Sequence, residues 1–170
     1  MRRKLILLAA VPAFAWADMP GTESAWLIET VDDSMSSASE IIALVQDSTK
    51  TIKDESASNE VTPRLEFRCT PGDAAVMARI DWQRFISSFS TEVGFKVDSG
   101  RFTWLKWKVD SSEQVTSSPS ADDSQKLIDL LKSGDQLLVE VSPYSQGPET
   151  AAFNLNGFSA ALDALLSKCQ

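Results

Sequence analysis

Residues 63–80, PRLEFRCTPGDAAVMARI, contain the strongest local signal for the fold. Leu65, Phe67 and Cys69 alternate with charged residues, and this period of two is typical of a strand with one buried face. The proline and glycine at 71–72 supply a tight turn, after which apolar residues return at every second position. The stretch therefore predicts an antiparallel β-hairpin in which Cys69 faces the interior.

Similar strand patterns recur along the chain, at residues 24–31, 41–45, 93–97, 102–109, 137–141 and 151–155. The polar stretch 47–62 is predicted to be a surface loop. Two segments have helical periodicity. The first groups Leu127, Leu130 and Leu131 on one face, after an N-cap at 122–124 and before a terminating Gly134. The second covers 158–169. We expect a mainly β domain, an antiparallel sandwich or open barrel with two helices.

The spacing of Trp104 and Trp107 is odd for a strand with one buried face and suggests a β-bulge or a strand covered on both sides. With Lys106 and Lys108 the two rings could form an aromatic and basic contact patch. The competing interpretation places the rings in the core and the lysines in solvent. The core is favoured for one tryptophan, and the other stays open.

The two cysteines, Cys69 and Cys169, both fall on predicted core faces, one on a strand and one at the end of the last helix. An even pair in an exported chain predicts a disulfide, here one that fastens the C-terminal helix over the sheet. The alternative is a pair of free thiols, one of them catalytic. It is disfavoured because the chain has no histidine to activate a thiol.

The N-terminus has the three parts of a secretory signal peptide over residues 1–17. Arg2, Arg3 and Lys4 precede an apolar run at 5–14, and Ala15-Trp16-Ala17 supplies small residues at the cleavage positions. The run is shorter than the about 20 residues that span a bilayer. We therefore expect a single secreted domain, 18–170, in the periplasm.

Charge and composition narrow the possible functions. The formal net charge is −8, and it falls to −11 without the three basic residues of the signal peptide. Such a surface disfavours nucleic acid and anionic lipid, and no second apolar segment predicts membrane insertion of the mature chain. The absence of histidine, of G-x-S-x-G and of a phosphate-binding loop disfavours an enzyme, and no metal or cofactor is expected.

One loop is a candidate contact site for a protein partner. Residues 142–148, SPYSQGP, connect two predicted strands, and the prolines restrict the loop around an aromatic ring. We assign Pro143, Tyr144, Gln146 and Pro148 to partner binding. A plain hairpin connection with a packed tyrosine is the competing interpretation.

Several short motifs occur together in order along the chain. They are 26–28 with 32–35, 63–69, 80–82 with 85–86, Trp104 and Trp107 with Ser111, 137–141, 143–144, 148–158 and Cys169. In this order the chain resembles the type VI secretion-associated VasI/TagO family of exported proteins. The resemblance implies a periplasmic accessory protein with no known catalytic residue. The polar segments 47–60 and 111–124 depart from the pattern.

The sequence thus predicts a non-enzymatic exported accessory or binding protein whose partner lies in the cell envelope. The main alternative is an inhibitor of a periplasmic or secreted hydrolase, in which the acidic domain plugs a basic cleft. A third possibility, carriage of a small ligand inside a barrel, rests on the aromatic content alone.

Overall fold

A computed structural model describes residues 25–31 and 40–170. The expected signal peptide and the residues 32–35 of the family motif lie outside this part of the chain. The elements are β1 (Leu27–Val31), β2 (Ile41–Asp47), β3 (Ile52–Lys53), β4 (Glu60–Val61), β5 (Arg64–Thr70), β6 (Asp73–Asp81), β7 (Ser90–Val97), β8 (Thr103–Val109), β9 (Val115–Ser117), α1 (Ala121–Leu131), β10 (Gln136–Val141), β11 (Glu149–Asn154) and α2 (Phe158–Cys169).

The hairpin predicted from residues 63–80 is confirmed as β5 and β6. Leu65 and Phe67 are fully buried and stand opposite Ile80 and Ala78 in the register. Gly72 takes a φ of +83° in the connecting turn, a conformation that glycine adopts without the steric cost of a side chain. Alternation therefore positions this hairpin at the centre of the core.

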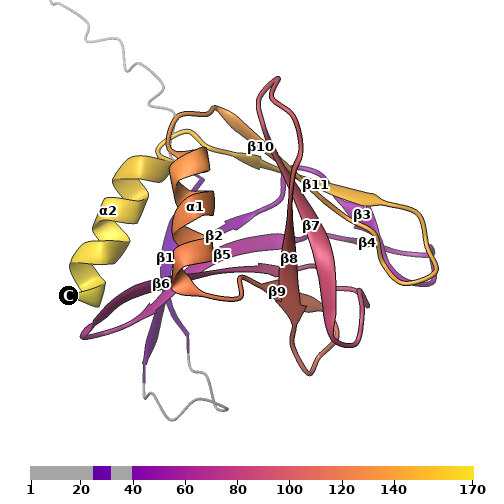
Figure 1. Cartoon of the computed structure of the whole chain (residues 1–170), viewed down its shortest axis with the longest axis horizontal. Coiled ribbons are helices and arrows are strands. Elements are labelled where there is room, and N and C mark those ends of the chain that lie inside the picture. Colours follow the sequence, from indigo (N-terminus) through magenta and orange to yellow (C-terminus); the bar gives the residue numbers. More distant parts are fainter. Residues whose placement is uncertain (1–24, 32–39) are drawn as a thin grey trace, which may run out of the picture.

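Nine strands form one antiparallel sheet in the order β1-β2-β5-β6-β9-β8-β7-β10-β11, and β3 and β4 form a separate small hairpin (Figure 1). The sheet curls until β11, at one end of the order, reaches the C-terminal end of β2. There the Gln46 side chain donates to the carbonyl of Asn154 at 2.9 Å and accepts from its amide at 2.8 Å. The Ser48 hydroxyl likewise donates to the Ala152 carbonyl and accepts from its amide, both at 3.1 Å, and the Thr49 amide donates to the same carbonyl at 2.7 Å. Of the two predicted architectures, the structure has the open barrel and not the sandwich, because one continuous curled sheet surrounds the core instead of two separate sheets.

The two helices lie next to each other on one side of the curled sheet (Figure 1). α2 buries Phe158 against Trp26 and Phe67, with ring centroids 5.0 and 5.2 Å away. α1 is fastened to β6 through Ser124, whose hydroxyl accepts from the Ala78 amide at 2.9 Å. Both helices were expected near these positions, so the helical periodicity was informative.

Two details of the first helix differ from the prediction. The N-cap is Ser120 and not residues 122–124, because the Ser120 hydroxyl accepts from the Asp123 amide. Leu130 is exposed, and Ile128 takes the buried position that was assigned to it. The buried face therefore consists of Ser124, Leu127, Ile128 and Leu131, a stripe slightly rotated from the one that the three leucines suggested.

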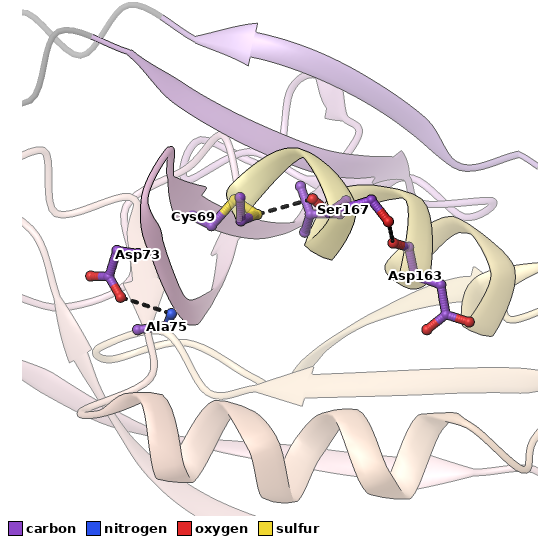
Figure 2. Close-up of a disulfide and its surroundings, with 7 residues drawn as sticks. Cys69, Asp73, Ala75, Asp163 and Ser167 are labelled. Carbon is purple, nitrogen blue, oxygen red and sulfur yellow. Dashed lines mark hydrogen bonds between the residues drawn. A yellow bond between two sulfur atoms is a disulfide. The ribbon is translucent and has the colours of Figure 1, made fainter.

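The disulfide between Cys69 and Cys169 is confirmed, with a Cα–Cα distance of 5.9 Å. It ties the C-terminus of α2 to β5, as Figure 2 shows. A backbone bond from the Gly72 amide to the Cys169 carbonyl, at 2.8 Å, holds the helix end to the β5–β6 turn as well. The last helix is thus fixed both covalently and by the backbone.

Two further expectations need correction, and one short strand was not predicted. The stretch 47–62 is not a plain loop, because it contains the hairpin of β3 and β4. The short strand β9 lies in the segment 111–124 and bridges β6 and β8. No bulge separates Trp104 from Trp107, since β7 and β8 pair in unbroken register, and the odd spacing instead places the two rings on opposite faces.

Candidate binding surface

The predicted contact loop, Pro143–Pro148, joins β10 to β11 at the end of the sheet farthest from the helices (Figure 1). The residues of this loop differ in how much of their surface is exposed to solvent. Tyr144 is 74% exposed, Gln146 and Pro148 are exposed, and Pro143 is buried. The Tyr144 amide donates to the Ile86 carbonyl at 2.9 Å, so the backbone of the loop is held against the segment before β7. The tyrosine is therefore anchored through its backbone while its ring points into solvent.

A buried cation holds the rest of the loop in place. Arg84 is only 1% exposed and donates to the Lys53 carbonyl at 2.5 Å and to the Glu149 carboxylate at 3.0 Å. Its other terminal nitrogen donates to the side-chain oxygen of Gln146. The Gln146 amide nitrogen then donates to the Glu55 carbonyl at 3.1 Å. One guanidinium thus joins the contact loop to the β3–β4 hairpin, and we call this group the Arg84 clamp.

Arg84 was not singled out from the sequence, although a signal was present. Trp82, Arg84 and Ile86 alternate with a period of two, and all three are buried. A cation at a position where the pattern requires an apolar residue indicates a buried charge with partners elsewhere in the chain. The sequence gives no indication of which partners these are.

Two exposed rings lie beside each other at this end of the molecule. Phe89 is 85% exposed, and with Tyr144 and Phe85 it lines a hollow of about 340 Å³ that Ser87 and Ser88 complete. We call Phe85, Phe89 and Tyr144 the aromatic surface. Neighbouring exposed aromatic rings on a small domain are typical of a site that another molecule covers.

The lining of this hollow suits binding better than catalysis. It offers phenyl rings, a phenol and two serine hydroxyls, with no carboxylate, amine or thiol among its five residues. A serine hydroxyl without a neighbouring base is a weak nucleophile. The chemistry available on the aromatic surface is apolar contact and neutral hydrogen bonding.

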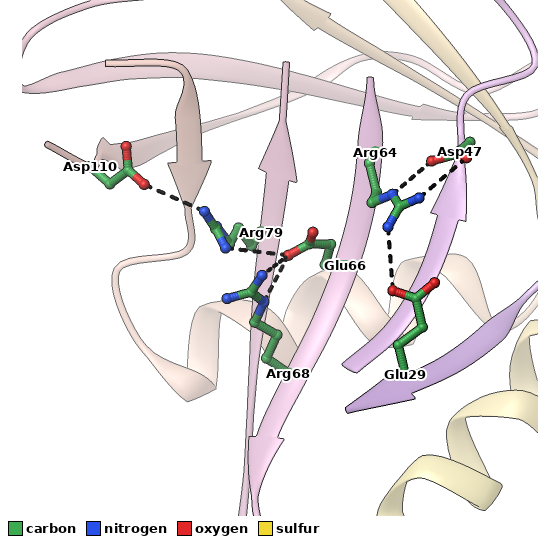
Figure 3. Close-up of polar contacts among 7 residues, drawn as sticks. All are labelled: Glu29, Asp47, Arg64, Glu66, Arg68, Arg79 and Asp110. Carbon is green, nitrogen blue, oxygen red and sulfur yellow. Dashed lines mark hydrogen bonds and ion pairs between the residues drawn. The ribbon is translucent and has the colours of Figure 1, made fainter. Parts of the chain in front are cut away.

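A second polar cluster, on the outer face of β1, β2, β5 and β6, has a structural explanation (Figure 3). The buried Glu66 carboxylate pairs with Arg68 at 2.7 Å and with Arg79 at 3.5 Å. Arg64 pairs with Asp47 at 2.7 Å and with Glu29 at 3.3 Å. The hydrogen bond to Asp47 is the largest of the effects that raise the pKa of Arg64 above its usual value. Since each arginine pairs with a carboxylate on its own or a neighbouring strand, the cluster ties the sheet together.

No three histidine, cysteine, aspartate or glutamate side chains gather as a metal site within residues 25–31 and 40–170. In the same part of the chain, no helix is long and apolar enough to cross a membrane. Both cysteines are consumed by the disulfide, so neither is a free thiol. The aromatic surface is therefore the candidate site that the described residues support best.

Comparison with known proteins finds a solved structure with a similar fold but assigns the chain to no family. No protein-family profile matches the sequence, and no curated protein is similar to it. The structure is similar to the crystal structure of invasion associated protein B from Bartonella henselae, with a TM-score of 0.50 and 13% sequence identity. The likeness covers 84% of this chain and 92% of that chain. At this identity, what the two proteins share is the fold.

Proposed function

We propose that the protein is an exported, non-enzymatic accessory protein that binds a protein partner through the aromatic surface. The observation that carries this proposal is the combination of two highly exposed rings, Phe89 and Tyr144, with a buried clamp that fixes the loop carrying one of them. Large rings in solvent give no packing energy to the free protein, whereas covering them in a complex does.

The Arg84 clamp favours affinity because it limits the motion of the loop before binding. Immobilising a loop at an interface costs free energy, and a loop that is already held pays less of that cost. Tyrosine is also over-represented among the residues that dominate interface energetics, because it combines a large rigid ring with a hydroxyl. Tyr144 has both properties and lies at the edge of an apolar hollow.

The proposed location is the periplasm, reached through the signal peptide expected at 1–17. The Cys69–Cys169 disulfide supports export, since such bonds persist in oxidising compartments. The more specific assignment, an accessory protein of type VI secretion, rests on the resemblance to the VasI/TagO family described above.

Inhibition of a periplasmic or secreted hydrolase is the second candidate. A rigid loop between two strands, as in β10 and β11, has the form of an element that enters a cleft. The net charge of −8 would favour a basic cleft over an acidic one.

Genetic complementation tests the type VI assignment. In a strain that encodes both this protein and a type VI apparatus, we expect deletion of the gene to reduce release of the tube protein into the medium. The Phe89→Ala/Tyr144→Ala variant should fail to restore release while accumulating in the periplasm to normal levels. Leu130→Ala is the matched control, because it removes an exposed apolar side chain from α1, at the opposite end of the molecule in Figure 1.

Unchanged release after deletion would refute the type VI role. If purified protein then inhibits a hydrolase encoded beside it, and the double variant does not, the inhibitor role replaces it. Full function of the double variant in both assays would show that the aromatic surface is not the binding site.

A further inference from the structure

A second hollow, separate from the aromatic surface, lies on the outer face of β7 and β8. It is shallow, has a volume of about 390 Å³, and is lined by Thr91, Glu92, Trp104 and Ser142. Its volume falls in the range of about 300–1,000 Å³ that is typical of small-ligand sites. Trp104 is 45% exposed, in contrast to Trp107 three residues later, which is fully buried.

The indole ring of Trp104 is seated on the sheet at a residue that has no side chain. Gly94 stands directly opposite Trp104 in the β7–β8 register. A Cβ atom at Gly94 would come within 3.0 Å of two atoms of the indole six-membered ring and within 3.1 Å of the Phe102 ring. Phe102 also packs against Trp104, with ring centroids 5.7 Å apart and planes inclined by 31°. The indole ring thus packs over Gly94 and against the Phe102 ring, while 45% of the residue's surface stays exposed to solvent.

The lining around the ring is polar, and its one charged side chain is that of Glu92. Thr91 and Ser142 provide hydroxyls, and Glu92 provides a carboxylate. Glu92 is paired in register with Lys106 on the neighbouring strand, and the Lys96 ammonium lies 5.8 Å from the centroid of the Phe102 ring, so both signs of charge are present on this part of the sheet. A ligand that covers this hollow must offer an apolar face to the indole and hydrogen-bonding groups to its rim, without a charge of its own.

We propose that the Trp104 hollow binds a neutral oligosaccharide. One face of a pyranose ring presents C–H groups, which carry partial positive charge and pack on the electron-rich face of an aromatic ring. Its hydroxyls and N-acetyl groups can donate to the Glu92 carboxylate and exchange hydrogen bonds with Thr91 and Ser142. An anionic glycan or a phosphate ligand is disfavoured by Glu92 and by the net charge of −8.

This inference does not rest on the proposed function. The lining residues Thr91, Glu92 and Trp104 lie on β7 and β8, and Ser142 begins the loop that carries Tyr144, but the two sites share no lining residue. Variants of one site leave the side chains of the other in place, so the two proposals fail separately.

Calorimetric titration of the purified disulfide-bonded protein with chitotriose and cellotriose tests the proposal, and the change in tryptophan fluorescence provides a second readout. We expect saturable binding of at least one trisaccharide, and binding weaker by about tenfold or more in Trp104→Ala. Trp104→Phe should retain part of the affinity. Glu92→Gln keeps the size of the side chain and should weaken binding. Leu130→Ala, an exposed apolar position on α1, is the matched control and should bind normally.

Gly94→Ala provides an independent check, because it leaves every lining residue present and forces the indole to shift by a few tenths of an ångström. It should weaken binding while the melting temperature shows that the domain is still folded; if it does not fold, Trp104→Phe and Glu92→Gln decide. Saturable binding lost in Trp104→Ala and kept in Leu130→Ala supports a glycan site. No saturation by either trisaccharide up to about 10 mM, equal affinity in Trp104→Ala, or preference for a cationic peptide over both sugars would overturn it.

Discussion

Replacing Arg84 by methionine is the sharpest test of how the contact loop is held. Methionine keeps most of the apolar stem within the buried site but removes the guanidinium and its bonds to Lys53, Gln146 and Glu149. The backbone bond between Tyr144 and Ile86 is not touched by the substitution. Any change therefore reports on the Arg84 clamp.

The expected loss of stability depends on how well the former partners of Arg84 are solvated or hydrogen-bonded after the substitution. Removing one member of a buried ion pair costs about 3–5 kcal/mol when the other stays buried. The Glu149 side chain is 24% exposed, so water can solvate part of its charge and the cost falls toward the lower end of that range. The carbonyl of Lys53 loses a donor, which adds about 1 kcal/mol. Methionine recovers some packing that the charged side chain did not supply. We expect a net destabilisation of about 2–4 kcal/mol.

Urea unfolding monitored by tryptophan fluorescence gives this free energy, and hydrogen exchange reports on the loop. The amides of residues 144–149 should exchange faster in Arg84→Met, whereas those of α2 should change only by the global loss of stability. In a double-mutant cycle with Glu149→Gln, the double variant should lose less stability than the two single variants combined. A destabilisation below about 0.5 kcal/mol with unchanged loop exchange would refute the clamp.

Three further predictions concern other parts of the fold. Cys69→Ser/Cys169→Ser should lower stability in urea by about 2–5 kcal/mol, because the bond closes a loop with a sequence separation of 100, and a native protein with two alkylatable thiols would contradict it. Gln46→Ala should lower the free energy of unfolding by about 1–3 kcal/mol and speed hydrogen exchange of the Asn154 amide, because the buried Gln46 side chain forms hydrogen bonds with both the carbonyl and the amide of Asn154. Unchanged exchange would show that the curled sheet does not depend on Gln46. The pKa of Asp54 is lowered from 3.8 to about 2, chiefly by the hydrogen bond from the Asn59 side chain. Its carboxylate therefore stabilises the β3–β4 turn fully above pH 3.8 and loses this effect as the pH falls through about 2. Carboxyl titration by NMR should show the low pKa in the native protein and a higher one in Asn59→Ala, still below 3.8 because the bonds from Ser56, Ser58 and the backbone of residue 59 remain.

Much of the fold could be predicted from the sequence, because the determining patterns are local. Period-two alternation in β5 and β6 predicts which side chains are buried, and this prediction needs no information about the rest of the chain. The helical spacing from Phe158 to Cys169 does the same for α2, and together these patterns place both cysteines on interior faces, from which the disulfide follows. The short strands in polar segments could not be predicted in this way. β3, β4 and β9 have two or three residues each, too few for a period to be recognised.

The candidate site is different, because its geometry depends on segments far apart in the chain. The sequence suggested the loop and its tyrosine as a candidate contact site, but not that Tyr144 would be exposed while Pro143 is buried, nor that Phe89 would line the same hollow. Arg84 acts across 31 residues to Lys53 and 65 residues to Glu149. Gly94 and Trp104 meet only because β7 and β8 pair in that register. Periodicity specifies which face of an element is buried, but only the packed sheet determines which exposed groups become neighbours, since that depends on strand order, register and curvature together.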